Sequence, residues 1–254
     1  MSCPGLPLLP GGADRGWDMK NLSRIARSGL MVALVAAAAV VSGGRVMAAD
    51  CHDTPNAGVD WSECTKKNLM LEGSDFEKAS LAGTDLSQTS LKNANLASAN
   101  LEKATLIRAW LEGAKADGAR FDKIEAYRVV FQNASAQRAS FISAELQRAD
   151  FTGAQLSGAN FEKAELGRAT FETAVLTGAR FALANLSRAD LSGASFEGSI
   201  DFDRAFMFLT RIEGLDLSAA TGLQQSQIEL ACGDTSTKLP SGLTMPKNWP
   251  CATD

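Results

Sequence analysis

Residues 141–180 read FISAELQRAD FTGAQLSGAN FEKAELGRAT FETAVLTGAR. Phe or Leu stands at every fifth position of this stretch, beginning at Phe141, and Ala stands two residues before each one. A period of five suits neither a helix, where these residues would wind around the cylinder, nor a flat strand, where they would alternate between faces. If all of them are buried alike, the chain must turn by a fixed angle every five residues. We therefore expect a coil with five-residue sides that stacks on itself as a solenoid.

The same period runs far beyond this stretch. Centres at spacing five run from Trp61 to Phe196, and after a slip of one residue the series resumes at Phe202 and ends at Leu217. We predict one inserted residue near Gly198, which forms a local bulge. The 28 repeats before the slip and the four after it predict about eight coils.

A second period, of 20 residues, gives the number of sides. It is carried by the arginine column, which comprises Arg108, Arg128, Arg148, Arg168 and Arg188. Twenty residues make four five-residue sides, so each residue should stack on its counterpart in the next coil. The phenylalanines then form two ladders on opposite sides, Phe121, Phe141, Phe161 and Phe181 in one and Phe131, Phe151 and Phe171 in the other.

The repeat resembles the motif of the pentapeptide-repeat family, which is written A-(D/N)-L-x-x. In this chain it reads Ala94-Asn95-Leu96, Ala99-Asn100-Leu101, Ala149-Asp150-Phe151, Ala184-Asn185-Leu186 and Ala189-Asp190-Leu191. The match covers residues 59–217. The resemblance implies an all-β fold, a right-handed quadrilateral β-helix.

Residues 1–49 have the pattern of a signal peptide. The basic residues of its first part are Lys20, Arg24 and Arg27. They precede an unbroken apolar run of 12 residues, 30–41, and Val46 and Ala48 then occupy the −3 and −1 positions of a cleavage site. The mature chain should begin near Ala49 or Asp50. An alternative start at Met19 would give a signal peptide of ordinary length.

Export predicts a periplasmic or secreted protein. A retained membrane anchor is the alternative to cleavage, but 12 apolar residues are too few for a spanning helix, which needs about 20. Loss of residues 1–49 removes five basic and two acidic residues, so the net charge moves from −4 to −7.

Four cysteines remain after cleavage, in two pairs that are close in sequence. An even number in an exported chain indicates disulfides. Four cysteines allow three connectivities, and only local pairing leaves the middle of the repeat unconstrained. A zinc site is the alternative, but neither pair has C-x-x-C spacing and His52 is the only histidine. We predict the disulfides Cys51–Cys64 and Cys232–Cys251.

Both ends of the repeat are expected to be capped, because an open last coil invites end-to-end pairing. Residues 50–64 form the predicted N-terminal cap, which lays Trp61 on the first coil. Residues 218–254 form the predicted C-terminal cap, a short helix followed by a proline-containing loop, and Thr221 to Gln224 fit a helix capping box. With both ends covered, we expect a monomer.

The arginine column is the sharpest surface feature. Stacked guanidinium groups about 4.8 Å apart would repel one another if they were unpaired. Glu125, Glu145 and Glu165 stand three residues before three of the arginines. One interpretation is therefore a ladder of exposed ion pairs, each of which contributes little. The other is an anion-binding strip for sulfated, phosphorylated or uronic polymers.

No pattern in the sequence is typical of a catalytic, cofactor or metal site. Catalysis needs an acid, a base or a nucleophile held in a cleft, whereas His52 lies in a loop rich in Pro, Asn and Gly. The family resemblance raises another class, because some cytoplasmic pentapeptide-repeat proteins mimic DNA and bind a type II topoisomerase. Export and the arginine column both argue against that role.

The sequence therefore predicts a non-enzymatic structural or protein-interaction module of the periplasm or the exterior. Its partner would be an unidentified protein or an envelope polymer, and not a nucleic acid. One alternative is a binder of anionic envelope polysaccharide that uses the arginine column. The other, if the chain is not exported, is a DNA-mimicking topoisomerase inhibitor.

Overall fold

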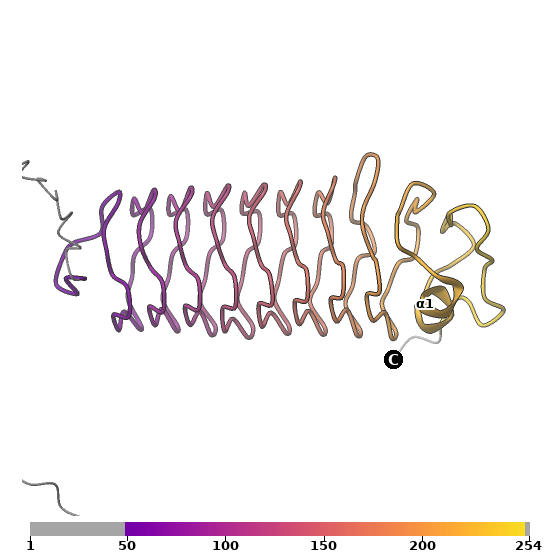
Figure 1. Cartoon of the computed structure of the whole chain (residues 1–254), viewed down its shortest axis with the longest axis horizontal. Helices are drawn as coiled ribbons and strands as arrows, with labels where there is room; N and C mark the ends of the chain where they lie inside the picture. Colours follow the sequence, from indigo (N-terminus) through magenta and orange to yellow (C-terminus); the bar gives the residue numbers. More distant parts are fainter. Residues whose placement is uncertain (1–48, 252–254) are drawn as a thin grey trace, which may run out of the picture. The chain divides into compact units, whose positions relative to one another are not determined.

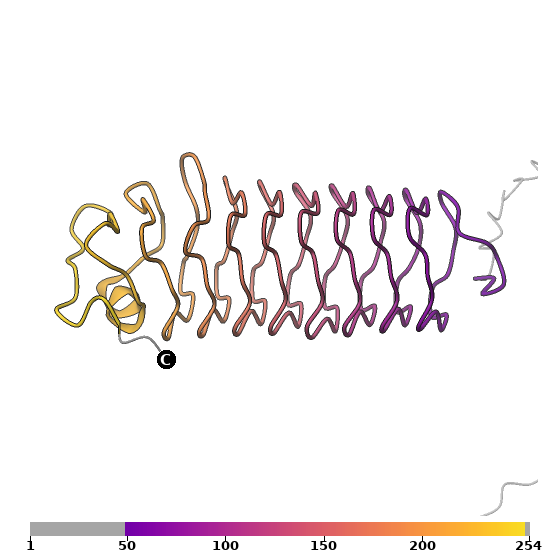
Figure 2. The same ribbon diagram turned by 180° about the vertical axis from the view of Figure 1, so that it is seen from behind.

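The computed structural model describes residues 49–251, in which the chain winds into a regular stack of coils (Figures 1 and 2). The predicted signal peptide, apart from Ala49, and the alternative start at Met19 lie outside these residues. Helix α1 (Gln225–Leu230) is the one helix of the described chain and lies near its C-terminal end. No helix of this part is long and apolar enough to cross a membrane.

Parallel bridges between residues 20 apart build four sides. Side 1 starts with the bridge of Asp60 to Ser80, side 2 with Thr65 to Asp85, side 3 with Met70 to Ser90, and side 4 with Asp75 to Asn95. On side 1 the N–H of Leu81 donates to the carbonyl of Asn100 at 2.7 Å, and the N–H of Asn100 donates to the carbonyl of Ala79 at 2.9 Å. The predicted 20-residue period and the four-sided β-helix are confirmed.

A tight turn at each corner carries the chain from one side to the next. The N–H of Ala149 donates to the carbonyl of Leu146 at 3.0 Å, which closes the turn through Gln147 and Arg148. The third residue of each turn has a positive φ, for example 59° at Arg148 and 68° at Gly153. Gly adopts this left-handed conformation without strain, whereas other residues do not.

The predicted centres fill the interior. The ring of Phe141 lies parallel to that of Phe161, with centroids 4.8 Å apart and 6° between the planes. It meets the ring of Phe151, in the other ladder, edge to face at 5.9 Å. The two predicted ladders are confirmed, and their rings interlock across the middle of the rod. The alanines that precede the centres are buried as well.

One extra residue interrupts the period where the sequence slips. Arg180 pairs with Asp201 rather than with position 200. Ile200 then takes the slot that Ala holds elsewhere, and it is buried, as is the next centre, Phe202. Phe196, predicted as the last centre before the slip, is only half-buried and directly precedes the segment that holds the inserted residue.

The first coil departs from the repeat at Lys66. This lysine occupies the position of a centre, yet its ammonium lies 3.7 Å from the centroid of the Trp61 ring and donates to the carbonyl of Cys51 at 2.7 Å. A charged side chain fits there because no coil precedes it. The disulfide Cys51–Cys64 is present in the same segment and holds the residues before Trp61 against this end.

The ladders continue past residue 217, where the sequence predicts the end of the repeat. Thr221 pairs with Asp201 on side 1, Cys232 with Arg211 on side 3, and Lys238 with Asp216 on side 4. On side 2 the bridge is replaced by α1, whose Leu230 carbonyl accepts a hydrogen bond from the N–H of Leu209 at 2.7 Å. The C-terminal segment thus builds a last, irregular coil, which the disulfide Cys232–Cys251 ties to the chain end.

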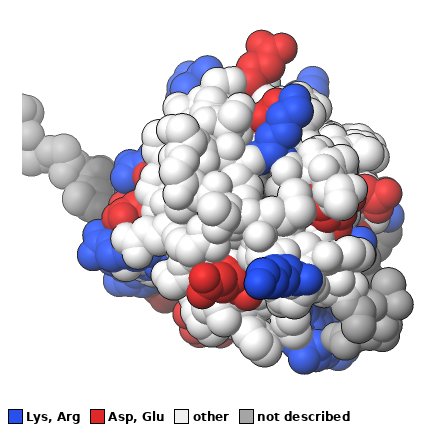
Figure 3. Space-filling view, turned by 90° about the vertical axis from the view of Figure 1, so that its right-hand side faces the viewer, with Lys and Arg blue, Asp and Glu red and all other residues white. Residues whose placement is uncertain are grey.

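Helix α1 is capped differently from the prediction. Thr221 lies in the side 1 ladder and the N-cap is Gln224, so the capping box predicted from Thr221 is wrong. The side chain of Gln227 accepts a hydrogen bond from the N–H of Gln224 at 2.8 Å. It also donates to the carbonyls of Phe202 and Ala205, both at 2.9 Å. The buried amide therefore starts the helix and fixes it to the preceding coil. The end face on this side is largely uncharged in its middle, with charged side chains around it (Figure 3).

Candidate functional site

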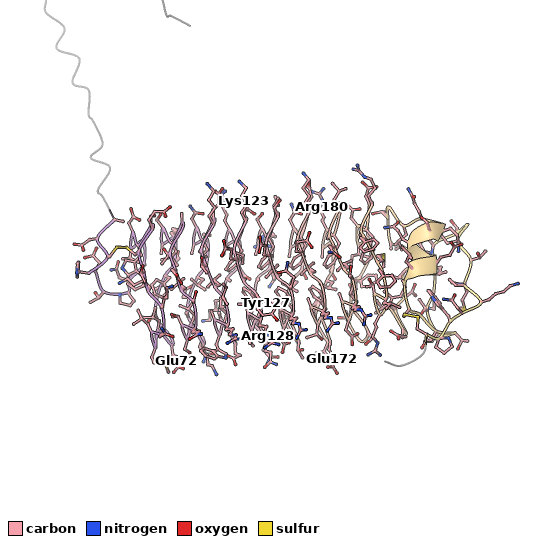
Figure 4. The ribbon with its side chains drawn as sticks, turned by 90° about the horizontal axis from the view of Figure 1, so that it is seen from below. Glu72, Lys123, Tyr127, Arg128, Glu172 and Arg180 are labelled. Atoms are coloured by element: carbon pink, nitrogen blue, oxygen red, sulfur yellow. A yellow bond between two sulfur atoms is a disulfide. The ribbon has the colours of Figure 1, made fainter. Side chains whose placement is uncertain are left out.

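The arginine column follows the corner between sides 2 and 3. Each arginine is the third residue of its turn, with φ between 55° at Arg108 and 61° at Arg168, and each is exposed. The backbone stacks from coil to coil, as where the N–H of Arg128 donates to the carbonyl of Gln147 at 3.0 Å. Figure 4 places Tyr127 and Arg128 between Lys123 and Arg180 at one margin and Glu72 and Glu172 at the other.

The glutamates expected beside these arginines lie on another surface. Glu125 and Glu145 are bridge residues of side 2, where they stack on each other and point from the flat side. Among residues 49–251, none of the four column arginines Arg108, Arg128, Arg148 and Arg168 forms an ion pair with a carboxylate. The ladder of direct ion pairs does not form. Each glutamate points from the flat side, whereas the arginine three residues later lies on the corner and points in another direction.

Arginines on the flat sides behave differently. Arg120 on side 1 pairs with Glu102 at 2.9 Å, and Lys123 reaches the same carboxylate at 3.3 Å. The hydrogen bond from Lys123 lowers the pKa of Glu102 below its ordinary value, and the nearby positive charges act in the same direction. Arg211 on side 3 pairs with Asp190 at 3.1 Å. The column arginines Arg108, Arg128, Arg148 and Arg168 thus differ from the flat-side arginines in having no carboxylate partner among the described residues.

Two aromatic side chains accompany the N-terminal part of the column. Trp110 is a bridge residue of side 3 and its side chain is 39% exposed, while Tyr127, beside Arg128 on the corner, is 37% exposed. The guanidinium carbon of Arg128 lies 5.3 Å from the centroid of the Tyr127 ring. Sequence reasoning missed both residues, although Trp110 stands in the slot that the repeat usually gives to Asp, Asn or Ser.

Trp110 differs from the other tryptophans of the described chain. The indole N–H of Trp61 donates to the carbonyl of Asp53 at 3.2 Å, and that of Trp249 donates to the carbonyl of Ala231 at 2.7 Å. Both belong to the ends of the rod. The indole N–H of Trp110 has no hydrogen-bond partner among residues 49–251. The indole N–H and the guanidinium groups of Arg108 and Arg128 are therefore hydrogen-bond donors that lie next to the apolar Trp110 ring.

The remaining sequence candidates lie elsewhere. His52 is an exposed residue of the N-terminal loop, 3.4 Å from Asp50, and the arginine column is on the walls of the coils. In the described part of the chain, no group of three or more His, Cys, Asp or Glu side chains is placed to hold a metal ion. The candidate site therefore comprises Arg108, Trp110, Tyr127 and Arg128.

Comparison with known proteins identifies the repeat. A family model described as a pentapeptide repeat region matches residues 104–181, and a model of pentapeptide repeats in eight copies matches residues 71–106 and 164–200. No curated protein matches the chain.

Several solved structures are similar to the chain at low identity. A trypsin-treated form of QnrB1, a plasmid-mediated fluoroquinolone resistance protein, is 22% identical with a TM-score of 0.43, over 74% of this chain and 87% of that chain. HetL, a pentapeptide repeat protein involved in heterocyst differentiation regulation in the cyanobacterium Nostoc, is 22% identical with a TM-score of 0.30, over 76% and 88%.

The family models and the geometry agree on the same repeat. The matched residues lie within the four ladders of period 20, and the alanine and centre positions of the motif are the buried positions of the coils. The chain therefore belongs to the pentapeptide-repeat family.

Proposed function

We propose that this protein is a non-enzymatic interaction module that works in the periplasm or outside the cell. The observation that carries the proposal is the filled interior, in which stacked rings such as Phe141 and Phe161 leave the chemistry to the outer walls. On those walls the bridge residues of successive coils stack in columns. Such a rod offers a rigid, preorganised surface to a partner.

Two features support the extracytoplasmic location. Residues 1–49 have the pattern of a signal peptide. The disulfides Cys51–Cys64 and Cys232–Cys251 stand at the two ends of the rod, and disulfides persist in oxidising compartments. A cytoplasmic DNA mimic would need neither feature.

N-terminal sequencing of the protein recovered from a periplasmic fraction tests the location. We expect the chain to begin near Ala49 or Asp50. Recovery from the cytoplasm with Met1 or Met19 intact would contradict export and would favour the DNA-mimicking alternative. A pull-down from the periplasmic fraction, with the disulfide-bonded protein as bait, would then identify a protein partner.

A second candidate function is binding of an anionic envelope polysaccharide through the arginine column. The specific observation in its favour concerns the column arginines Arg108, Arg128, Arg148 and Arg168. They are exposed, and within residues 49–251 they do not pair with the glutamates of side 2. Guanidinium groups bind carboxylates and sulfates through two parallel hydrogen bonds. A column of them matches a polymer that carries a negative charge on each unit.

Retention on immobilised polygalacturonate at low and high salt tests this second function. The variant Arg148→Gly/Arg168→Gly should elute at lower salt than the wild type. Gly is compatible with the left-handed backbone at both positions, so the fold should persist. Arg138→Gly is the matched control, because Arg138 is also exposed with a φ of 56° but lies on the corner between sides 4 and 1. Equal elution of all three proteins would contradict the proposal.

A further inference from the structure

We propose that Arg108, Trp110, Tyr127 and Arg128 form an aromatic subsite that binds one uronic acid residue of an acidic polysaccharide. Trp110 would stack on the sugar ring while the arginines hold its carboxylate. The inference rests on the proposed polysaccharide-binding function of the arginine column and names its substrate class. It also assigns a role to the two aromatic residues, which the column alone leaves without one.

The surroundings of Trp110 leave its ring open. Its neighbours along side 3 are Ser90 in one coil and Val130 in the next. Ser90 is small and buried, and its hydroxyl donates to Glu72 at 2.8 Å. Val130 is half-buried. Both neighbours are smaller than Trp110, whose side chain remains 39% exposed on this wall.

The cations lie along the edge of that wall. Arg108 precedes Trp110 by two residues at the corner of sides 2 and 3, and Arg128 stacks on Arg108 one coil further along. The Tyr127 ring beside the Arg128 guanidinium orients that group by a cation–π contact. An apolar ring with charge-assisted donors at its margin suits a ligand that has a C–H face and a carboxylate at its edge.

The rest of side 3 provides acceptors for hydroxyl groups. Beyond Val130 the bridge residues are Asp150, Thr170 and Asp190. Asp150 is held in place by a hydrogen bond of 2.7 Å from Gln132. Carboxylates accept hydrogen bonds from sugar hydroxyls, so a chain that continues along side 3 meets arginines on one edge and acceptors on the flat wall.

The same arrangement disfavours single-stranded nucleic acid. Proteins that bind it stack successive bases on successive aromatic side chains. On side 3 only one bridge residue between Met70 and Arg211 is aromatic, and carboxylates such as Asp150 follow where further rings would be needed. An acidic polysaccharide needs one stacking surface and then hydroxyl acceptors, which is what the wall offers.

Calorimetric titration of the purified, disulfide-bonded protein tests the subsite. The probes are a short oligogalacturonate, a neutral malto-oligosaccharide and a single-stranded oligothymidylate. The variant is Trp110→Ser, which takes the residue that side 3 already carries at position 90, so the coil can accommodate it. We expect oligogalacturonate binding to weaken about tenfold or more, a loss of about 1.4 kcal/mol or more of binding free energy.

The matched control is Phe206→Asn. Phe206 is a bridge residue on side 2 that is 51% exposed, and the position before it in the same column is Asn185. This variant should bind oligogalacturonate within about twofold of the wild type, a change too small to represent a lost contact. A second readout is fluorescence, because Trp110 is the exposed indole of the described chain, so the signal change on adding oligogalacturonate should vanish in Trp110→Phe.

The outcomes separate the subsite from the column. If Arg108→Gly/Arg128→Gly loses binding while Trp110→Ser binds like the wild type with no fluorescence change at Trp110, the subsite is wrong and the column stands. If the wild type binds no oligogalacturonate, both proposals fall. Equal or tighter binding of the oligothymidylate, or of the neutral oligosaccharide, would overturn the assigned substrate class. Loss in Trp110→Ser with unchanged thermal unfolding, and retention in Phe206→Asn, supports it.

Discussion

The ammonium group of Lys66 lies 3.7 Å from the centroid of the Trp61 ring, at the end of the rod where the first coil has no predecessor. Burial lowers the pKa of Lys66, and the carboxylates of Asp53 and Asp50 oppose that shift. Lys66 occupies a position that other coils fill with a buried apolar centre. A charge at this point blocks the stacking of a further coil on the interior, which is one way that proteins protect open β-edges.

Replacing Lys66 by Ala should therefore weaken the N-terminal end of the rod. We expect the free energy of unfolding to fall by about 0.5–1 kcal/mol, the size of a cation–π contact at an exposed site. Denaturant titration measures it. Lys115→Ala, at an exposed bridge position of side 4, is the control and should stay within about 0.5 kcal/mol. Equal effects of the two changes would show that the contact with Trp61 contributes nothing.

The interior is packed so closely that removing side-chain volume and adding it should both lower the stability of the fold. Phe131 touches three other rings, stacked on Phe151 at 5.1 Å and edge to face with Phe121 at 5.4 Å and Phe141 at 5.7 Å. Phe131→Ala should lower the free energy of unfolding by about 3–5 kcal/mol, because it removes these contacts and leaves a cavity. Urea titration with tryptophan fluorescence gives the value.

Ala126→Phe tests the same interior from the other direction. Ala126 is a fully buried centre in the coil that contains Phe121 and Phe131. Added volume there should lower the free energy of unfolding by about 1–3 kcal/mol. Glu172→Ala, at an exposed corner, should remain within about 0.5 kcal/mol. A harmless Ala126→Phe beside a damaging Glu172→Ala would mean that the phase of the repeat is misassigned.

The sequence predicts the repeating part of the fold because every coil meets the same physical conditions. A residue such as Phe141 is buried by identical neighbours above and below, so its burial appears as a period that can be read directly. At the ends this condition fails. Lys66 replaces a centre where no coil precedes it, and α1 replaces a bridge where none follows. Neither change has a period. The sequence predicts a short helix after residue 217, but not that this helix takes the place of a bridge on side 2.

The candidate site was only partly predictable for a different reason. The spacing of Arg128 and Arg148 fixes which residues stack, and the structure places them on one corner. Spacing does not fix the direction of a side chain across a turn, so the expected pairing with Glu125 and Glu145 was wrong. Trp110 is recognisable in the sequence as a large aromatic residue at a position that is usually polar. Its exposure on side 3, however, is known only from the structure.

The left-handed corners give a prediction about the backbone. At Arg148, where φ is 59°, Gly should be more stable than Ala by about 1 kcal/mol, because Ala retains the clash of its Cβ in this conformation. At Glu145, a bridge residue of side 2, the order should reverse, with Gly less stable than Ala by about 0.5–1 kcal/mol. Thermal unfolding of the four variants decides it. The same order at both positions would contradict the corner geometry.

The two disulfides should stabilise the ends of the rod and leave the stability of its middle unchanged. Cys232–Cys251 closes a sequence separation of 19 and Cys51–Cys64 one of 13. Reduction should cost about 3 kcal/mol for each loop in the chain-entropy model. Hydrogen exchange before and after reduction should show faster exchange near both ends and unchanged protection at central coils such as that of Phe151. Uniform loss along the rod would instead indicate a single cooperative unit.

Asp234 makes the C-terminal end sensitive to acid. The hydroxyl of Ser236 donates to its carboxylate at 2.7 Å, and the N–H groups of Gly214 and Ser236 donate at 3.2 and 3.0 Å. These bonds, the Ser236 hydroxyl first, lower the pKa of Asp234 from 3.8 to about 2. Because this pKa is lowered in the folded state, the ionised carboxylate stabilises the fold at any pH above about 4. This contribution is lost as the pH falls from about 4 to about 2.

Asp234→Asn should therefore melt at a lower temperature than the wild type near neutral pH, and the difference should shrink toward about pH 2. Thermal unfolding of Asp234→Asn and the wild type across this pH range measures the difference. A gap between Asp234→Asn and the wild type that stays constant with pH would mean that the carboxylate charge plays no part in holding this end.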